Sequence, residues 1–211
     1  MLEHMKGAIF DLDGVIVDTA KYHFLAWQSL ARRLGFEFTG ADNERLKGVS
    51  RVESLRILLE IGSVKVDQQV FNEMAESKNN EYVEYIKRLQ PEEILPGAKT
   101  YLQQLRSKGI KIALGSASKN AEFILDKLEI ADLFDAIIDG NKVSKAKPDP
   151  EVFVMASVSL GLDPKDCVVF EDAEAGVQAG KAAGSKVVGI GSQHILKEAD
   201  FVIAGLYELV G

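Results

Sequence analysis

The chain has 211 residues, 46% of them hydrophobic and 27% charged, and this composition excludes an intrinsically disordered protein. Its formal net charge of −7 argues against nucleic-acid binding as the main function, because that function needs a basic surface. No apolar run approaches the roughly 18 residues that a membrane span needs, so we expect no membrane partner. The length allows one large domain, or one domain that carries a smaller one.

A single cysteine, Cys167, lies inside an apolar run, which indicates a buried core thiol. One cysteine cannot form an intrachain disulfide, and this fits a reducing compartment. The N-terminus lacks a basic segment followed by an apolar stretch, so the sequence predicts no secretory signal. We therefore expect a cytoplasmic protein.

Short apolar runs alternate with helical patterns along most of the chain. The runs cover residues 6–10, 110–116, 134–139, 166–172, 185–191 and, as a short last strand, 200–205. Helical patterns cover residues 98–107, 119–129, 149–161 and 173–184. Continuous apolar runs of this length are typical of strands buried on both faces of a parallel sheet. The alternation predicts an α/β fold with a Rossmann-like, doubly wound parallel sheet.

Residues 18–92 do not follow this alternation. Apolar residues recur there at helical spacing, in the stretches FLAWQSLARRLG, VESLRILLEIG and NEYVEYIKRL. Pro91, Pro96 and Gly97 then mark the return to the sheet. We therefore predict an α/β core domain formed by residues 1–17 and 93–211, with an α-helical domain of residues 18–92 inserted after the first strand.

Polar side chains follow four of the predicted strands. In an open parallel sheet, ligands bind beyond the carboxyl ends of the strands, so these side chains are expected to meet. They are Asp11 and Asp13; then Ser116, Ala117, Ser118, Lys119 and Asn120; then Lys147; and finally Glu171 and Asp172. Carboxylates packed together repel, and Mg²⁺ relieves this because it prefers a few carboxylates, water and phosphate oxygens. Acids, a metal, a hydroxyl and a lysine are typical of phosphoryl transfer, for which a carboxylate can be the covalent nucleophile.

This set of residues resembles the motifs of the haloacid dehalogenase superfamily of phosphotransferases. The stretch DLDGV, from Asp11, resembles the first motif, Ser116 the second and Lys147 the third. Lys145 is a second lysine nearby, but Lys147 is followed by proline as in the motif. The resemblance implies that Asp11 is the nucleophile and Asp13 the general acid/base, with Ser116 and Lys147 as further catalytic residues.

The fourth motif of the superfamily resembles the stretch ED, at residues 171–172. The resemblance implies one Mg²⁺ per chain, held by Asp11, by the backbone carbonyl of Asp13 and by Asp172. Glu171 is implied as a second acid near the metal, either as a ligand or behind the ligands. Gly115 stands where a slightly bulkier small residue is usual, and we expect it to loosen that turn.

The helical insert resembles the cap domain of a subgroup that includes the β-phosphoglucomutases and small sugar-phosphate phosphatases. The stretches DLDGVIVDTAKYHFLAW, LKGVSRVESL, SKNNEYV, IALGSASKN and KPDPEVF resemble the β-phosphoglucomutase family in particular. The resemblance implies an isomerase that interconverts β-D-glucose 1-phosphate and glucose 6-phosphate. An aspartyl phosphate and β-glucose 1,6-bisphosphate are the implied intermediates, and the bisphosphate is also the priming phosphoryl donor.

The cap would supply the residues that select the substrate. Arg51 could grip the phosphate that does not react, bidentately, and the resemblance places His23 near Asp13 and Trp27 on the inner cap face. By residue type alone, His23 also fits an ordinary polar helix position and Trp27 a core position. The predicted substrate-binding residues are Thr19, Trp27, Lys47, Gly48, Val49, Ser50, Arg51, Ser54, Lys78, Asn79, Ala117, Ser118, Lys119 and Asn120.

Two other functions remain open from the sequence. A Mg²⁺-dependent phosphatase acting on a sugar phosphate or another small ester would share every core residue, so only the cap distinguishes it. A non-catalytic binding module descended from such an enzyme would be expected to lose Asp11 or Asp13, and both are present. In either enzymatic case we expect a monomer whose partner is a small sugar phosphate.

Overall fold

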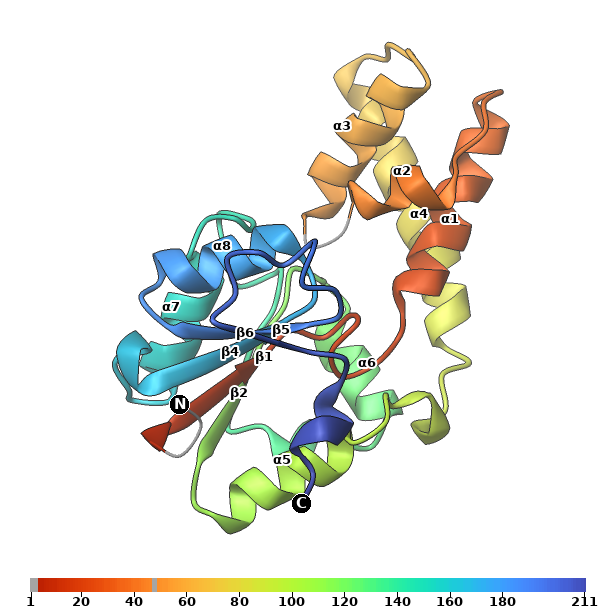
Figure 1. The fold of residues 1–211 in the computed structure, drawn as a ribbon. Helices are drawn as coiled ribbons and strands as arrows, with labels where there is room; N and C mark the ends of the chain where they lie inside the picture. Colours follow the sequence, from red (N-terminus) through yellow and green to blue (C-terminus); the bar gives the residue numbers. More distant parts are fainter. Residues whose placement is uncertain (1–3, 47–48) are drawn as a thin grey trace.

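The computed structural model describes residues 4–46 and 49–211, and its centre is a parallel sheet of six strands (Figure 1). The strand order is β3-β2-β1-β4-β5-β6, and each neighbouring pair is parallel. The strands are β1 (Gly7–Phe10), β2 (Lys111–Gly115), β3 (Ala136–Ile138), β4 (Cys167–Glu171), β5 (Lys186–Ile190) and β6 (Phe201–Ile203). Each lies within one of the six apolar runs, so the predicted doubly wound α/β fold is confirmed.

Helices cover both faces of the sheet, which explains why the strands are continuously apolar. Along β1, Ala8 and Phe10 belong to one buried cluster, whereas Ile9 belongs to the other. The first cluster contains side chains of α5 (Ala98–Ser107) and α6 (Ala121–Lys127). The second contains side chains of α7 (Glu151–Ser159) and α8 (Glu174–Ala182). All four helices lie within the predicted ranges.

Short 3₁₀ helices complete the core. They are η2 (Pro91–Glu93), η3 (Ala131–Leu133), η4 (Pro164–Asp166) and η5 (Leu206–Leu209). Gly97, with φ +80°, precedes α5, and a Cβ there would lie 2.4 Å from the backbone of Tyr207. Glycine is therefore required where η5 packs against the start of α5.

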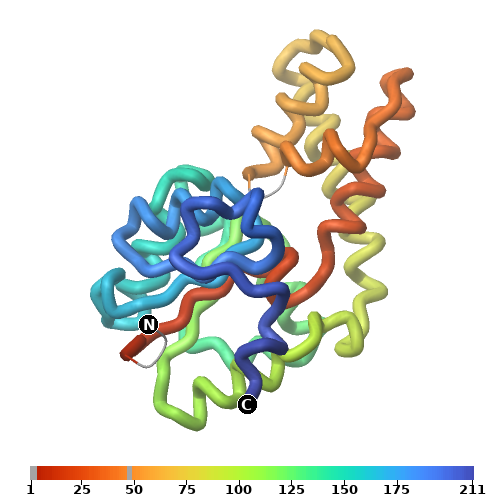
Figure 2. The backbone as a smooth tube through the Cα atoms, in the orientation of Figure 1, coloured from red at the N-terminus to blue at the C-terminus, as the bar shows by residue number. Residues whose placement is uncertain are grey.

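The helices of the insert form a separate layer beside the sheet (Figure 2). They are α1 (Ala20–Arg33), α2 (Gly40–Glu44), α3 (Arg51–Ile61) and α4 (Gln68–Ile86). Their own buried cluster consists of Trp27, Leu30, Ala31, Phe38, Leu46, Leu55, Leu58 and Leu59. This cluster supports the division into a core (residues 1–17 and 93–211) and a cap (residues 18–92), which stays a prediction, while Ala26, Tyr82 and Ile86 of the insert belong to the core cluster. None of the helices in the described part of the chain is long and apolar enough to cross a membrane.

The two segments that join cap and core lie side by side. The backbone N–H of Leu95 donates to the carbonyl of Ile16 at 2.9 Å. The carboxylate of Glu93 accepts hydrogen bonds from Lys21 Nζ at 2.8 Å and from the Tyr22 hydroxyl at 2.7 Å. The base of the cap is thus tied together at the point where the chain leaves and re-enters the core, next to the carboxyl ends of the strands.

Candidate active site

The centre of the site lies where β1 and β4 run next to each other in the sheet. The strand order reverses its direction along the chain at this point, and in doubly wound sheets this is where ligands bind. Asp11 directly follows β1, and its backbone N–H donates to the carbonyl of Phe170 at 2.9 Å. Glu171 ends β4 and Asp172 follows it. Three predicted acids are therefore brought to one edge by strand pairing alone.

Lys147 is buried between two of these acids. Its Nζ donates to Asp11 Oδ1 at 2.6 Å and to Glu171 Oε2 at 2.8 Å, and the Lys147 side chain is 1% exposed. Burial disfavours a charged amine, but the charges of Asp11 and Glu171 outweigh it and raise the pKa of Lys147. The ammonium therefore stays charged and fixes the orientation of the Asp11 carboxylate.

Asp11, Glu171 and Asp172 form a group that could hold a metal ion. Each offers a carboxylate oxygen, and these oxygens lie within 4.8 Å of one another. Burial, followed by the charge of Asp11, raises the pKa of Glu171 to about 7, although Lys147 opposes the rise. Negative charge therefore exceeds what Lys147 neutralises. The oxygen-only donor set fits the predicted Mg²⁺, which would relieve this excess.

Two glycines make room for these carboxylates. Gly14 has φ +77°, and a Cβ there would lie 2.1 Å from Asp172 Oδ2. A Cβ on Gly176, in α8, would lie 2.0 Å from Glu171 Cδ. Such distances are far below van der Waals contact, so larger residues would displace the acids. The glycine of the DLDGV stretch, Gly14, thus leaves room for Asp172 of the fourth motif to lie against the first motif.

Asp13 lies on the same side of the site but in a different environment. Its Oδ1 atom is buried and has no hydrogen-bond partner among the described residues. Burial, with a further contribution from the charge of Asp11, raises the pKa of Asp13 to about 8. A carboxyl that keeps its proton at neutral pH can donate it to a leaving oxygen, so the structure supports the predicted acid/base role of Asp13.

Two more buried hydroxyls lie at this junction of core and cap. Thr19 Oγ1, just before α1, and the Tyr82 hydroxyl, on α4, also have no partner among the described residues. Burial raises the pKa of Tyr82 well above its usual value, and the charge of Asp13 adds to the rise. Unpaired buried polar atoms cost free energy, about 1–3 kcal/mol each, so they concentrate where a function compensates for the cost.

The loop after β2 is held by its own hydroxyls. Ser116 Oγ accepts a hydrogen bond from the backbone N–H of Ser118 at 3.1 Å, and Ser118 Oγ accepts one from the backbone N–H of Asn120 at 3.2 Å. A Cβ on Gly140 would lie 2.3 Å from the Ala117 carbonyl oxygen, so glycine lets the loop after β3 approach. The predicted phosphate-binding residues therefore form one ordered turn.

Gly115 does not loosen this turn, and the expectation that it would is wrong. A Cβ on Gly115 would lie 2.9 Å from the ring of Phe153 and 3.2 Å from Ile9. The Phe153 ring in turn lies 4.7 Å from Lys147 Nζ, measured to its centroid. Glycine at this position lets α7 pack tightly under Lys147, which a bulkier residue would prevent.

The cap contributes a buried lysine with unusual neighbours. Lys78 Nζ lies 2.7 Å from His23 Nδ1, 4.3 Å from the centroid of the Trp27 ring and 4.9 Å from that of Tyr82. The His23 ring also stacks on Tyr82, with centroids 3.9 Å apart. Burial and the charge of Arg51 lower the pKa of Lys78 well below its usual value, and burial and Lys78 lower that of His23. The two groups therefore compete for one proton, and aromatic rings supply the remaining contacts.

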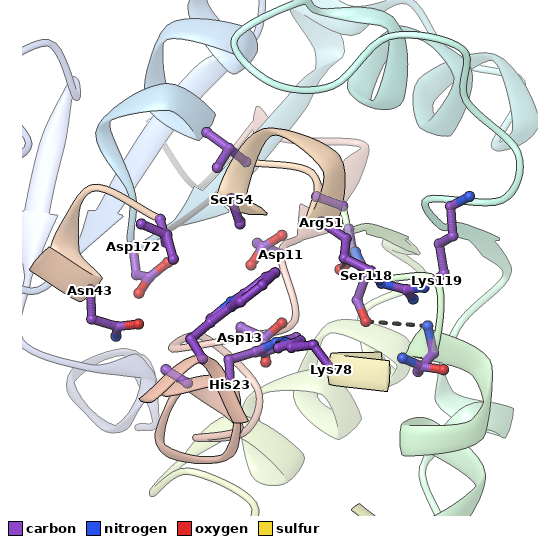
Figure 3. A pocket seen from close by; sticks show the side chains of 17 residues that line it. Asp11, Asp13, His23, Asn43, Arg51, Ser54, Lys78, Ser118, Lys119 and Asp172 are labelled. Carbon is purple, nitrogen blue, oxygen red and sulfur yellow. Dashed lines mark hydrogen bonds between the residues drawn. The ribbon is translucent and has the colours of Figure 1, made fainter. Parts of the chain in front are cut away.

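Core and cap enclose a common pocket of about 100 Å³ that is partly open to solvent (Figure 3). In this view Arg51, Ser118 and Lys119 lie on one side of Asp13, and Asp172 lies on the other. The lining residues are Asp11, Asp13, Ala20, His23, Trp27, Asn43, Leu46, Val49, Arg51, Ser54, Lys78, Ser116, Ala117, Ser118, Lys119, Asn120 and Asp172. The pocket thus has a basic end and an acidic end.

Not all predicted residues line the pocket. Lys147 and Glu171 lie next to Asp11 but do not line the pocket. Lys47 and Gly48 lie outside the described residues. Ser50 begins α3, where its hydroxyl accepts the backbone N–H of Glu53 at 3.2 Å, and it lines a neighbouring cavity instead.

Asn79 and Thr19 also do not line the pocket, although both were predicted to bind substrate. Asn79 is hydrogen-bonded to Asn120, and the Thr19 side chain is fully buried.

Some lining residues were not predicted. Ala20, Asn43 and Leu46 join the pocket from the start of α1 and from α2 and the turn after it. Their sequence context is an ordinary polar-apolar helix pattern, which carries no signal for a ligand. Tyr82 does not line the pocket, but its ring contacts Lys78 and His23. The sequence offered a signal for this contact, because Tyr82 lies one helical turn after Lys78 on α4 and two such positions share a helix face.

A model of the haloacid dehalogenase-like hydrolase family matches residues 5–184. The chain belongs to this family. It is 46% identical over 201 residues to a β-phosphoglucomutase of Bacillus subtilis strain 168, across 94% of this chain and 89% of that protein. It is 33% identical over 210 residues to a phosphorylated carbohydrates phosphatase of Thermotoga maritima, across 98% of this chain and 94% of that protein.

A solved structure supports the same assignment. A β-phosphoglucomutase from Clostridium difficile superposes with a TM-score of 0.94 and 43% identity, and the match covers 97% of this chain and 93% of that one. The predicted superfamily is confirmed, as is the resemblance to β-phosphoglucomutases. The acids at the strand ends and the helical insert are therefore those of a haloacid dehalogenase-like enzyme.

Proposed function

We propose that this protein is a Mg²⁺-dependent phosphomutase that interconverts β-D-glucose 1-phosphate and D-glucose 6-phosphate. The observation that carries the proposal is a pocket with catalytic acids at one end and cap cations at the other, in a chain 46% identical to a β-phosphoglucomutase. A mutase needs both ends, because its bisphosphate intermediate carries a phosphate on each side of the sugar. Hydrolysis of a simple ester needs only the acidic end.

The first transfer begins on an enzyme that carries a phosphoryl group on Asp11. Asp13 takes the proton from the 6-hydroxyl of β-D-glucose 1-phosphate, and the sugar oxygen bonds to phosphorus as the bond to Asp11 breaks. This produces β-glucose 1,6-bisphosphate. When bound, Mg²⁺ would be held by Asp11, Asp172 and the neighbouring Glu171, and it would neutralise negative charge between the nucleophile and the phosphoryl oxygens. Lys147 keeps Asp11 in its orientation throughout.

The second transfer returns the other phosphoryl group to the enzyme. The bisphosphate reorients, an Asp11 oxygen bonds to the phosphorus at C1, and the bond from that phosphorus to the sugar oxygen breaks. Asp13 donates its proton to the leaving oxygen, and glucose 6-phosphate is released. This proton is the one that Asp13 took from the 6-hydroxyl in the first transfer, and a pKa raised to about 8 favours its retention until this step. β-Glucose 1,6-bisphosphate also primes the enzyme, because it can phosphorylate an Asp11 that carries no phosphoryl group.

The cap has two functions in this proposal. Arg51 of the cap, together with Ser118 and Lys119 of the core, binds the phosphate that is not being transferred, and Arg51 can do so with two parallel hydrogen bonds. Trp27, His23 and Lys78 cover the sugar and exclude water, which would otherwise take the phosphoryl group from Asp11. We infer a cytoplasmic monomer without nucleic-acid or membrane partners; the net charge of −7 and the single buried cysteine support this.

Product identity tests the proposal. Purified protein is incubated with Mg²⁺, β-D-glucose 1-phosphate and a trace of β-glucose 1,6-bisphosphate. Glucose 6-phosphate is followed through a coupled dehydrogenase, and free phosphate is measured in parallel. We expect glucose 6-phosphate to form without a matching release of phosphate. Release of phosphate alone would establish a phosphatase on the same core, as in the relative from Thermotoga maritima, and would overturn the roles given to the cap.

A further inference from the structure

The Asn120 side chain forms a hydrogen bond with the cap and not with its own helix. It occupies the N-cap position of α6, where an asparagine side chain commonly accepts a hydrogen bond from the first turn of its own helix. Here it makes no such bond. Its Nδ2 instead donates to Asn79 Oδ1 of the cap at 3.2 Å. The Asn120 side chain thus bonds to Asn79, which is 41 positions away in the sequence, and not to the first turn of α6.

Asn79 is held in place by the helix that carries it. On α4, Tyr82 and Ile86 are fully buried, and both belong to the cluster that contains side chains of the sheet. Asn79, Tyr82 and Ile86 follow one another at spacings of three and four residues, so they share the face of α4 that rests on the core. The neighbouring residue, Lys78, turns to the pocket. Asn79 is therefore fixed at the edge of a packed interface.

Asn120 lines the pocket together with Arg51 and Lys119, whereas Asn79 does not line it. The bond to Asn79 uses one N–H of the Asn120 amide and fixes the plane of that amide. Its second N–H and its carbonyl oxygen remain for a ligand. We propose that Asn79 is a positioning residue that holds the Asn120 amide toward the phosphate that is not transferred. This inference rests on the proposed function, since only a sugar bisphosphate or mutase substrate places a phosphate there.

The substitution Asn79→Ala tests this proposal against a matched control, Asn80→Ala. Asn80 is the next residue of the same helix and is exposed to solvent. We expect Asn79→Ala to raise the KM for β-D-glucose 1-phosphate at least fivefold and to change kcat less than twofold, because a free Asn120 amide must be ordered by each substrate. Asn80→Ala should change neither constant more than twofold. Equal behaviour of the two variants would overturn the proposal.

A double-mutant cycle shows whether Asn79 acts through Asn120. If it does, Asn79→Ala combined with Asn120→Ala should have the same KM as Asn120→Ala alone, within twofold. If Asn79 instead contacts the substrate, the two increases in KM will multiply, and the positioning role is overturned. Should Asn79→Ala fail to fold, as judged by its Tm, Asn79→Ser is used in the same cycle, because it removes the amide and leaves less empty volume.

Hydrolysis of a small aryl phosphate separates positioning from a general structural defect. That substrate has no second phosphate, so the loss of kcat/KM in Asn79→Ala should be at least five times smaller for it than for the sugar phosphate. Equal losses for both substrates would overturn the proposal. Whether the proposed function itself fails is determined separately, by identifying the products that the wild-type enzyme forms from β-D-glucose 1-phosphate. A wild-type enzyme that only releases phosphate would refute the mutase, and the cycle would then be read on hydrolysis of the sugar phosphate.

Discussion

The two walls of the pocket handle charge in opposite ways. Behind the core wall, the buried Lys147 lies between Asp11 and Glu171, at 2.6 and 2.8 Å, so these two carboxylates share one cation. On the cap wall, Arg51 and Lys78 have no carboxylate partner among the described residues. Lys78 contacts His23 and two aromatic rings instead. The Asp11 carboxylate thus has a buried cationic partner, whereas the cations of the cap wall have no carboxylate partner in the described part of the chain.

This difference indicates what each wall is for. The core wall has an excess of carboxylates, so its missing component is a cation such as Mg²⁺. The cap wall has an excess of basic groups, which fits the binding of an anion such as the sugar phosphate of the proposed function. Phosphoryl chemistry is thus prepared by the sheet before substrate arrives, whereas recognition is completed only by the substrate.

The largest expected effect falls on the core wall. Asp11→Asn removes the nucleophile but keeps its shape, and we expect turnover to fall by at least about 10⁴-fold with the fold intact. Asp18→Asn, at an exposed position in the same segment, is the control and should retain wild-type turnover. The measurement is the rate of glucose 6-phosphate formation. A rate for Asp11→Asn within tenfold of wild type would exclude Asp11 as the nucleophile.

Lys147→Met should affect stability more than any substitution on the cap wall. It leaves two buried carboxylates without their partner, which costs about 3–5 kcal/mol of unfolding free energy. Lys145→Met is the control, because Lys145 pairs with Asp149 at 3.4 Å on the surface and its loss should cost at most about 1 kcal/mol. Urea unfolding without Mg²⁺ measures both. If the two variants are equally stable, the charges of the core wall are not tightly paired.

Gly14→Ala should weaken metal binding without changing the cap wall. The added Cβ meets Asp172, so we expect the Mg²⁺ concentration for half-maximal activity to rise about 10- to 100-fold, as for other displaced supports of metal ligands. Gly35→Ala is the control: Gly35 has φ +85°, which imposes similar backbone strain, but a Cβ there meets no atom within 4 Å. A similar Mg²⁺ requirement in both variants would mean that Gly14 does not seat Asp172.

The smallest expected effect is a gain of stability on the cap wall. Lys78→Met replaces a buried ammonium by an apolar side chain, and near pH 7 we expect the unfolding free energy to rise by about 1–2 kcal/mol while sugar-phosphate turnover falls. Because the pKa of Lys78 is lowered in the folded protein, the unfolded chain binds its proton more tightly, and wild-type stability rises with pH toward 10.5. The advantage of Lys78→Met should therefore shrink between pH 7 and pH 10. A pH-independent difference in urea unfolding would contradict this cause.

Much of the core could be predicted from the sequence because its signals are local. Each strand is a short apolar run, and each motif directly follows a strand, so the parallel topology alone brings Asp11 and Asp172 together. The contact between Lys78 and His23 could not be predicted, because the two residues are 55 positions apart and their contact depends on how α1 packs against α4. The partner of Asn79 was missed for the same reason. Gly115 was misjudged because its role depends on Phe153, which follows it by 38 positions and comes from another helix.

The substitution Arg51→Ala tests the central claim, that the cap wall serves the phosphate that is not transferred. Two reactions are compared: formation of glucose 6-phosphate from β-D-glucose 1-phosphate, and hydrolysis of a small aryl phosphate that carries one phosphate only. Arg45→Ala is the control, because Arg45 is a cap arginine that pairs with Glu60 on the surface at 3.3 Å. We predict that Arg51→Ala lowers kcat/KM of the mutase reaction at least about 100-fold, as expected for loss of a charged bidentate contact, and lowers hydrolysis less than about threefold. Equal losses in the two reactions would show that Arg51 supports the chemistry itself, and the division between the two walls would be wrong.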